Sequence, residues 1–220
     1  MRPFEEDLNQ LNEMLQEMGA LVARSIQRSV LSLVEKNEDY AHQVIRDESR
    51  VDQMEIQVDE MATSLIVREQ PVARDMRLVV SAIKISTDLE RMGDLAVHIA
   101  ERSLSLMTQP PLTEFISFEE ISGLVESMVL GSLESFVKRD AAIARSIVEM
   151  DNSVDRVRNA IQRQLTDLMK RDSSTIVRAL DVLIITRKLE RIADHATNIA
   201  EDVVFLIQGV DVRHRTAEVA

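Results

Sequence analysis

Two acidic segments of the chain repeat each other. The stretch LERMGDLAVHIAE at residues 89–101 recurs as LERIADHATNIAE at residues 189–201. Each copy holds a Glu-x-x-x-Asp pair and ends on a Glu. The acidic residues are Glu90, Asp94 and Glu101 in the first copy and Glu190, Asp194 and Glu201 in the second. Side chains four positions apart are neighbours on a helix, so each pair presents adjacent carboxylates. Hard multivalent cations bind to such groups of carboxylate oxygens.

A helical wheel gathers these carboxylates into one stripe. With Glu90 at zero, Asp94 lies at about 40° and Glu101 at about 20°, whereas the apolar seam centres near −140°. The seam has the 4-3-4 spacing of a bundle-packing face. Its residues are Ile85, Leu89, Met92, Ala96, Ile99 and Ser103, repeated as Ile185, Leu189, Ile192, Ala196, Ile199 and Val203. The stripe is therefore expected on the face away from the core.

An adjoining segment carries a second acidic stripe. Its residues are Glu48, Asp52, Glu55 and Asp59, and the second half keeps only Asp151 and Asp155. Arg158 and Gln162 stand where Glu55 and Asp59 stand in the first half. Carboxylates at i,i+4 repel by a few tenths of a kcal/mol, and facing stripes would repel more. Bound cations would relieve this repulsion.

The simpler interpretation is a solvated charged face. Ordinary exposed helices mix Glu with Lys for support, whereas these stripes are almost purely acidic, which favours metal binding. All-oxygen ligands suit Mg, Mn, Ca or Fe, and Zn also accepts carboxylate oxygen. We expect Arg158 to weaken the second site. The candidate metal ligands are Glu48, Asp52, Glu55, Glu90, Asp94, Glu101, Asp151, Asp155, Glu190, Asp194 and Glu201.

The rest of the sequence predicts an all-α protein of six long helices. Val51-Asp52 matches Val154-Asp155 at a shift of 103 and Leu89-Glu90 matches Leu189-Glu190 at a shift of 100, which indicates a duplicated three-helix unit. Helices of about 30 residues span about 45 Å, and with short loops they pack as antiparallel bundles. We predict a first three-helix bundle at 1–108, a linker at 109–112 around the Pro pair, a second bundle at 113–209 and a tail at 210–220.

Composition excludes several functions. The net charge of −12 argues against nucleic acid as a partner, because basic surfaces supply most of that affinity. The absence of cysteine excludes thiolate metal sites and Cys nucleophiles. No apolar run reaches the ~20 residues that a membrane span requires. The acidic N-terminus does not resemble a signal peptide, so we expect a cytoplasmic protein.

The paired motifs resemble the signature of the PhoU family, whose members are accessory proteins of phosphate-specific transport and regulators of phosphate signalling. The stretch QPVARDMR at residues 70–77 resembles the segment that opens that family's third helix. The resemblance covers nearly the whole chain. It implies two three-helix bundles with multinuclear metal clusters held by the Glu(Asp)-x-x-x-Asp motifs. It also implies action with the ATPase subunit of the phosphate-specific ABC transporter and with a phosphate-sensing histidine kinase, to restrain the phosphate-starvation response. Such chains are often homodimers. Arg158 departs from the acidic pattern.

Two other functions fit less well. A carboxylate-bridged di-metal enzyme would place Glu-x-x-His motifs inside the bundle, and the sequence has none. It also lacks a Ser-His-Asp order and a Gly-rich phosphate loop, so we expect no catalysis. A metal-free helical scaffold shares every fold feature with the metal-binding regulator and differs only in whether the stripes bind cations. Metal retained after treatment with EDTA discriminates between the two.

Overall fold

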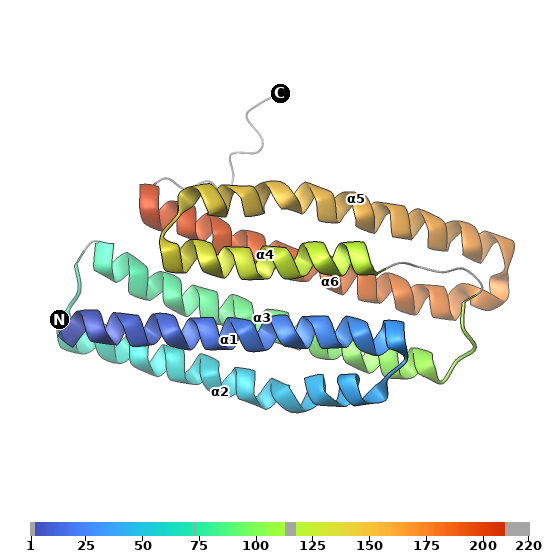
Figure 1. Cartoon of the computed structure of the whole chain (residues 1–220), viewed down its shortest axis with the longest axis horizontal. Coiled ribbons are helices and arrows are strands. Elements are labelled where there is room, and N and C mark those ends of the chain that lie inside the picture. Colours follow the sequence, from blue (N-terminus) through green and yellow to red (C-terminus); the bar gives the residue numbers. More distant parts are fainter. Residues whose placement is uncertain (1–2, 73, 113–117, 210–220) are drawn as a thin grey trace, which may run out of the picture.

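The computed structural model describes residues 3–72, 74–112 and 118–209, and in these ranges the chain is helical without strands. The first three helices form one bundle and the last three another (Figure 1). The helices are α1 (Pro3–Glu35), α2 (Glu38–Glu69), α3 (Arg74–Met107), α4 (Glu119–Lys138), α5 (Ala141–Arg171) and α6 (Ile176–Gln208), with a 3-10 turn, η1 (Ser173–Thr175), before α6. This confirms the predicted fold class of two tandem three-helix bundles.

The middle helix of each bundle starts on the same kind of cap. The Asn37 side chain accepts a hydrogen bond from the Asp39 backbone N–H, and the Asp140 carboxylate accepts from Ala142 and Ile143. Each cap satisfies an N–H that has no partner within the helix. The α2 helix ends at Glu69 and is followed by Gln70, whose left-handed backbone (φ 45°) precedes Pro71. These caps set where α2 and α5 begin relative to α3 and α6.

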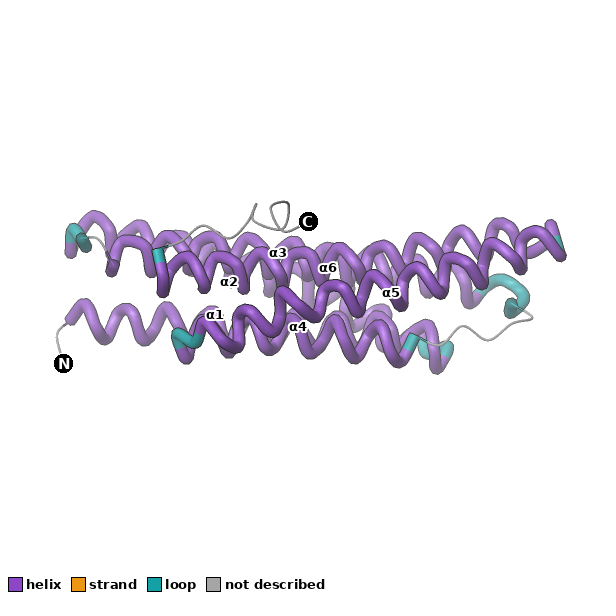
Figure 2. The backbone as a smooth tube through the Cα atoms, turned by 90° about the horizontal axis from the view of Figure 1, so that it is seen from above, coloured by secondary structure: helices purple, strands orange, loops and turns teal. Residues whose placement is uncertain are grey.

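The two bundles share one continuous apolar core. Both predicted seams are buried, with every member at 0% exposure. Beyond its own bundle, α3 packs on α6 and α1 packs on α4. All six helices follow the long axis of the molecule (Figure 2). Each bundle therefore depends on the other to cover part of its apolar surface.

Three polar pairs show how α3 meets α6. Lys84 Nζ lies 3.2 Å from Asp202 Oδ1, Asp88 Oδ1 lies 2.8 Å from His195 Nδ1, and Arg102 Nη1 lies 3.0 Å from Asp181 Oδ1. Residue numbers rise along α3 as they fall along α6, so the two helices are antiparallel (Figure 1). The halves are consequently related as by a two-fold axis.

The second half is not a full copy of the first. The α4 helix has 20 residues, whereas α1 has 33, so the predicted length of about 30 residues is wrong for α4. The predicted linker, 109–112, lies between α3 and α4. The predicted tail, 210–220, and the first residues of the predicted second domain, 113–117, lie outside the described residues. No described helix is long and apolar enough to cross a membrane.

Candidate metal centre

The acidic stripes of α2 and α3 come together in the first bundle. Asp52 on α2 and Glu90 and Asp94 on α3 each offer a carboxylate oxygen, and these oxygens all lie within 4.8 Å of one another. Over the described ranges, this is the one group of three or more acidic, His or Cys side chains with such spacing. A single cation can be bound by several carboxylates at this separation.

A close approach of the backbones positions this group. A Cβ added to Gly93 would lie 3.3 Å from Val51 Cγ1, which is tighter than ordinary contact. Gly93 directly precedes Asp94, and Val51 directly precedes Asp52. The missing side chain at Gly93 therefore lets α3 approach α2 where the two aspartates meet. The second half has Ala193 at the matching position.

Further carboxylates surround this group. Partial burial, followed by the charges of Asp94, Asp52 and Glu101, raises the pKa of Glu48, and nearby His98 opposes the rise. Partial burial, followed by Asp94, Glu55 and Asp52, raises the pKa of Glu90. Both shifts mean that ionisation is unfavourable here. A cation placed among these groups would remove that cost.

The acidic surface along the contact of α2 with α3, the first groove, is less exposed than the helical wheel predicted. Glu48, Glu90 and Asp94 are half-buried because α2 packs on α3, while Asp52 and Glu101 are exposed. The stripe lies off the seam, as expected, but in a groove rather than on the outermost face. Glu55 lies close enough to Glu90 to raise its pKa. The first half thus brings together Glu48, Asp52, Glu55, Glu90, Asp94 and Glu101.

The second groove, between α5 and α6, contains a fixed cation. Arg158 Nη2 lies 2.9 Å from Asp155 Oδ1 and 3.2 Å from Glu190 Oε1. The hydrogen bond to Asp155 raises the pKa of Arg158. The guanidinium therefore stays charged and neutralises part of the negative charge of carboxylates that were predicted as metal ligands.

The remaining carboxylates of this groove still interact. Burial raises the pKa of Asp151, aided by Asp155 and Glu190. Burial also raises the pKa of Asp194, with Glu190 the next cause. Glu201, the last predicted ligand of this half, is half-buried on α6. The structure thus brings Asp151, Asp155, Glu190 and Asp194 near one another, but around Arg158.

Sequence reasoning missed two features of these sites. The close approach at Gly93 was not predicted, and the only hint in the sequence was a Gly inside a helical pattern, which Gly123 shows is not specific. The pairing of His195 with Asp88 was also missed, because it joins the two halves across α3 and α6. His195 lies on the side of α6 that meets α3, whereas the acidic group faces α5.

Comparisons with known proteins identify relatives in which the same two-part architecture is expected. The family model described as "PhoU domain" matches twice, at residues 15–103 and 118–203. The phosphate-specific transport system accessory protein PhoU homologs of Pseudomonas putida and Aquifex aeolicus are 36% and 34% identical to the chain. The matches cover 96% and 98% of this chain and 83% and 97% of those proteins.

Solved structures agree with the sequence matches. The crystal structure of PhoU from Pseudomonas aeruginosa superimposes with a TM-score of 0.91 at 35% identity, covering 94% of this chain and all of that one (100%). The phosphate transport system regulatory protein PhoU from Streptococcus pneumoniae gives a TM-score of 0.86 at 27% identity, covering 95% of this chain and 99% of that one. Two domain matches, whole-length relatives and a shared fold lead to one conclusion: the chain belongs to the PhoU family.

Proposed function

We propose that this protein is a metal-binding, non-enzymatic regulator of phosphate homeostasis. It would act as an adaptor between the ATPase subunit of a phosphate ABC transporter and a phosphate-sensing histidine kinase, and would restrain the phosphate-starvation response. The relatives are named accessory proteins of phosphate-specific transport, and the relative from Streptococcus pneumoniae is named a regulatory protein of the phosphate transport system. The single observation that carries metal binding is the convergence of Asp52, Glu90 and Asp94.

The residues of the first groove suit a cation. Asp52, Glu90 and Asp94 would hold it, with Glu48 and Glu101 beside them. An all-oxygen ligand set favours Mg, Mn or Fe, and Zn also fits. A bound cation would supply positive charge that removes the mutual repulsion of these carboxylates and ties α2 to α3.

The same geometry supports regulation rather than catalysis. Asp52 and Glu101 are exposed and Glu90 is only half-buried, so water weakens electrostatic interactions here compared with a dry catalytic cavity. The positive charge of Arg158 would repel a metal ion in the second half. This is compatible with a metal site that has a structural or signalling role. A metal-bearing surface between two helices is suited to ordering an interface for a partner protein.

Metal binding is tested with the double variant Glu90→Gln/Asp94→Asn. We expect it to lose cation from the first half, measured by elemental analysis after loading with Mn²⁺ and desalting. Helix content should stay unchanged by circular dichroism, because both side chains lie off the apolar seam. The matched control is Glu13→Gln/Glu60→Gln, which removes two exposed carboxylates outside the groove. Equal metal content in the two variants would refute the site.

The adaptor role is tested in cells of the source organism. Deletion of the gene should switch on a phosphate-starvation reporter in phosphate-replete medium, and the wild-type chain should restore repression. Affinity capture from cells grown with and without phosphate should recover the transporter ATPase and the kinase. A reporter that stays silent in the deletion strain contradicts the regulatory role. Sedimentation and cell fractionation test the expected homodimer and cytoplasmic location.

A further inference from the structure

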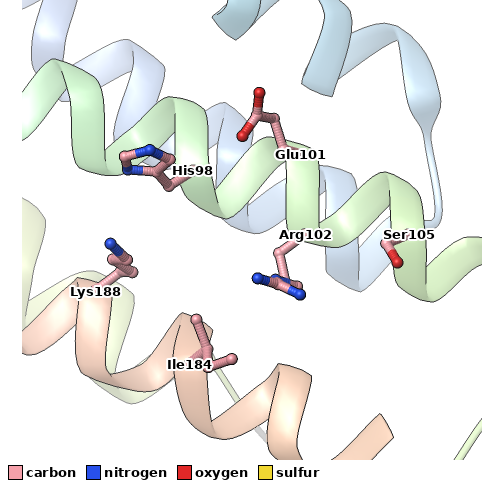
Figure 3. A pocket seen from close by; sticks show the side chains of 6 residues that line it. All are labelled: His98, Glu101, Arg102, Ser105, Ile184 and Lys188. Carbon is pink, nitrogen blue, oxygen red and sulfur yellow. The ribbon is translucent and has the colours of Figure 1, made fainter. Parts of the chain in front are cut away.

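A pocket of about 210 Å³ opens between α3 and α6, beside the first acidic groove. Four of its residues come from α3 and two from α6. It is lined by His98, Glu101, Arg102, Ser105, Ile184 and Lys188. Arg102 and Lys188 extend from opposite helices into the space between them, and Glu101 points away from that space toward α2 (Figure 3). Two long cationic side chains therefore line one pocket where the two halves of the protein meet.

The guanidinium of Arg102 is held in place and still has donors to spare. Its Nη1 donates to Asp181 Oδ1 at 3.0 Å, and the Arg102 side chain keeps 42% of its surface exposed. Arginine carries five N–H donors in a planar fork. Asp181 therefore orients the fork, and Arg102 still lines the pocket with N–H groups that this bond does not use. An oriented arginine loses less freedom when it binds an anion.

Lys188 has no ion-pair partner in the described part of the chain, and it is half-buried against α3. The opposite end of the α3–α6 contact is different. There Lys84 is paired with Asp202, and Asp88 with His195. A half-buried cation without a partner is unfavourable, and an anion bound between the helices would compensate for it.

The duplication supplies an internal comparison. Under the 100-residue shift, Arg102 corresponds to Asp202, Lys188 to Asp88, and Ser105 to Phe205. The two basic residues are thus acidic at the mirror end, and the hydroxyl is replaced by a ring. The basic pocket is consequently a property of this end of the interface and not of helix packing in general.

We propose that this pocket binds the phosphate group of a small oxyanion, held by Arg102 and Lys188. The fork of arginine and the ammonium of lysine both suit phosphate oxygens. The Ser105 hydroxyl and the His98 ring offer further donors at the rim. The volume lies below the ~300 Å³ at which pockets begin to hold drug-sized ligands. The ligand is therefore one phosphate group, as inorganic phosphate or as the end of a phosphate monoester. Binding requires no metal in the acidic groove.

The test measures binding of inorganic phosphate to the full chain by isothermal titration calorimetry, with EDTA present and ionic strength fixed. We expect saturable binding that Lys188→Gln weakens by about tenfold or more, the loss of one charge-assisted contact. Lys188→Arg keeps the charge and should retain most of the affinity. The matched control is Lys84→Gln, which removes a lysine from the mirror end of the same interface and should leave phosphate affinity within about twofold.

Adenosine monophosphate in the same titration distinguishes the two sources of the phosphate group. If inorganic phosphate binds more tightly, the ligand is free phosphate; if adenosine monophosphate binds more tightly, the ligand is a phosphate monoester. Either result supports the pocket as a phosphate site. Circular dichroism on each variant establishes that it is folded. The proposal is overturned if neither probe binds saturably to the wild-type chain. It is equally overturned if Lys188→Gln and Lys84→Gln bind phosphate with the same affinity.

Discussion

Arg158 Nη2 lies 3.2 Å from Glu190 Oε1, across the groove between α5 and α6. The corresponding position of the first half holds Glu55, whose negative charge instead raises the pKa of Glu90. One groove therefore contains its own cation, while the other has an excess of negative charge. We therefore expect the two halves to differ in cation affinity, although their backbones follow the same plan.

The first prediction compares the two sites directly. The variant Glu190→Gln/Asp194→Asn, which removes two carboxylates from the second half, should bind Mn²⁺ almost as tightly as the wild type. The Glu90→Gln/Asp94→Asn variant should bind it more weakly or bind fewer ions, because ligand charge tunes affinity at oxygen sites. Titration of both variants at one ionic strength measures this. Equal affinity in the two variants would show that the charge argument is wrong.

A second prediction concerns Arg158 itself. In the Glu90→Gln/Asp94→Asn background, Arg158→Glu should strengthen Mn²⁺ binding on the order of tenfold or more, because it removes a fixed positive charge and adds a ligand. Without metal, the same change should destabilise the fold by about 1–2 kcal/mol, since Asp155 and Glu190 lose their shared partner. Chemical denaturation and calorimetry measure the two effects.

The control for Arg158→Glu is Arg156→Glu. Arg156 is an exposed arginine on the same helix, hydrogen-bonded to Ser153 of its own helix rather than to the groove. The substitution Arg156→Glu changes the net charge by the same amount as Arg158→Glu and should leave Mn²⁺ affinity nearly unchanged. If both variants gain affinity equally, a general charge effect accounts for the result and the guanidinium does not block the site.

The third prediction follows from the raised pKa values of Glu48 and Glu90 above their usual 4.5. A carboxyl whose pKa is higher in the folded state contributes stability that is fully present below its unfolded pKa and lost as pH rises through its folded pKa. In EDTA, the free energy of unfolding of the wild type should therefore fall, relative to Glu48→Gln/Glu90→Gln, as pH rises from 4.5.

Saturating Mn²⁺ should reverse this trend. In the proposed site the deprotonated carboxylates would be the ligands, so the rise in Tm caused by the cation should grow over the same pH window. Urea unfolding at a series of pH values, with and without Mn²⁺, measures both. A wild type that gains stability relative to the variant as pH rises in EDTA contradicts the proposed repulsion.

The fourth prediction tests how α1 packs on α4. A Cβ added to Gly19 would lie 2.0 Å from Leu133 Cδ1, and Leu133 is buried. Gly19→Ala should destabilise the protein by about 1–2 kcal/mol, because overpacking outweighs the gain in helix propensity. Gly123 on α4 is exposed with nothing within 4 Å of an added Cβ. Gly123→Ala should therefore stabilise by about 0.5–1 kcal/mol. Urea unfolding decides the sign of each change.

Local sequence patterns predicted most of the fold. The seams through Leu89 and Leu189 have a helical period that is visible in the sequence alone, and both are buried. Wheel geometry likewise placed Glu90 and Asp94 on one stripe. The length of about 30 residues was wrong for α4 because it was carried over from the other helices, although the predicted linker at 109–112 leaves fewer residues before the cap at Asp140.

The parts that the sequence did not reveal depend on contacts between distant residues. The burial of Asp94 depends on how closely α2 approaches at Gly93, and the pairing of Arg158 with Glu190 depends on the rotation of α5 against α6. The basic pocket joins residues of α3 to Lys188 of α6, so it exists only once the halves are packed. None of these follows from helical periodicity within one segment.

The antiparallel contact of α3 with α6 also has an evolutionary consequence. Two copies of a half-length chain, packed through the equivalent helix, would form an isologous dimer in which each substitution appears twice. Fusion into one chain removes that constraint. Arg158 in one groove and Glu55 in the other, or Lys188 at one end and Asp88 at the other, are differences that such a dimer of identical chains cannot have. Joining the halves in one chain thus permits two unlike grooves and two unlike ends within one symmetric backbone plan.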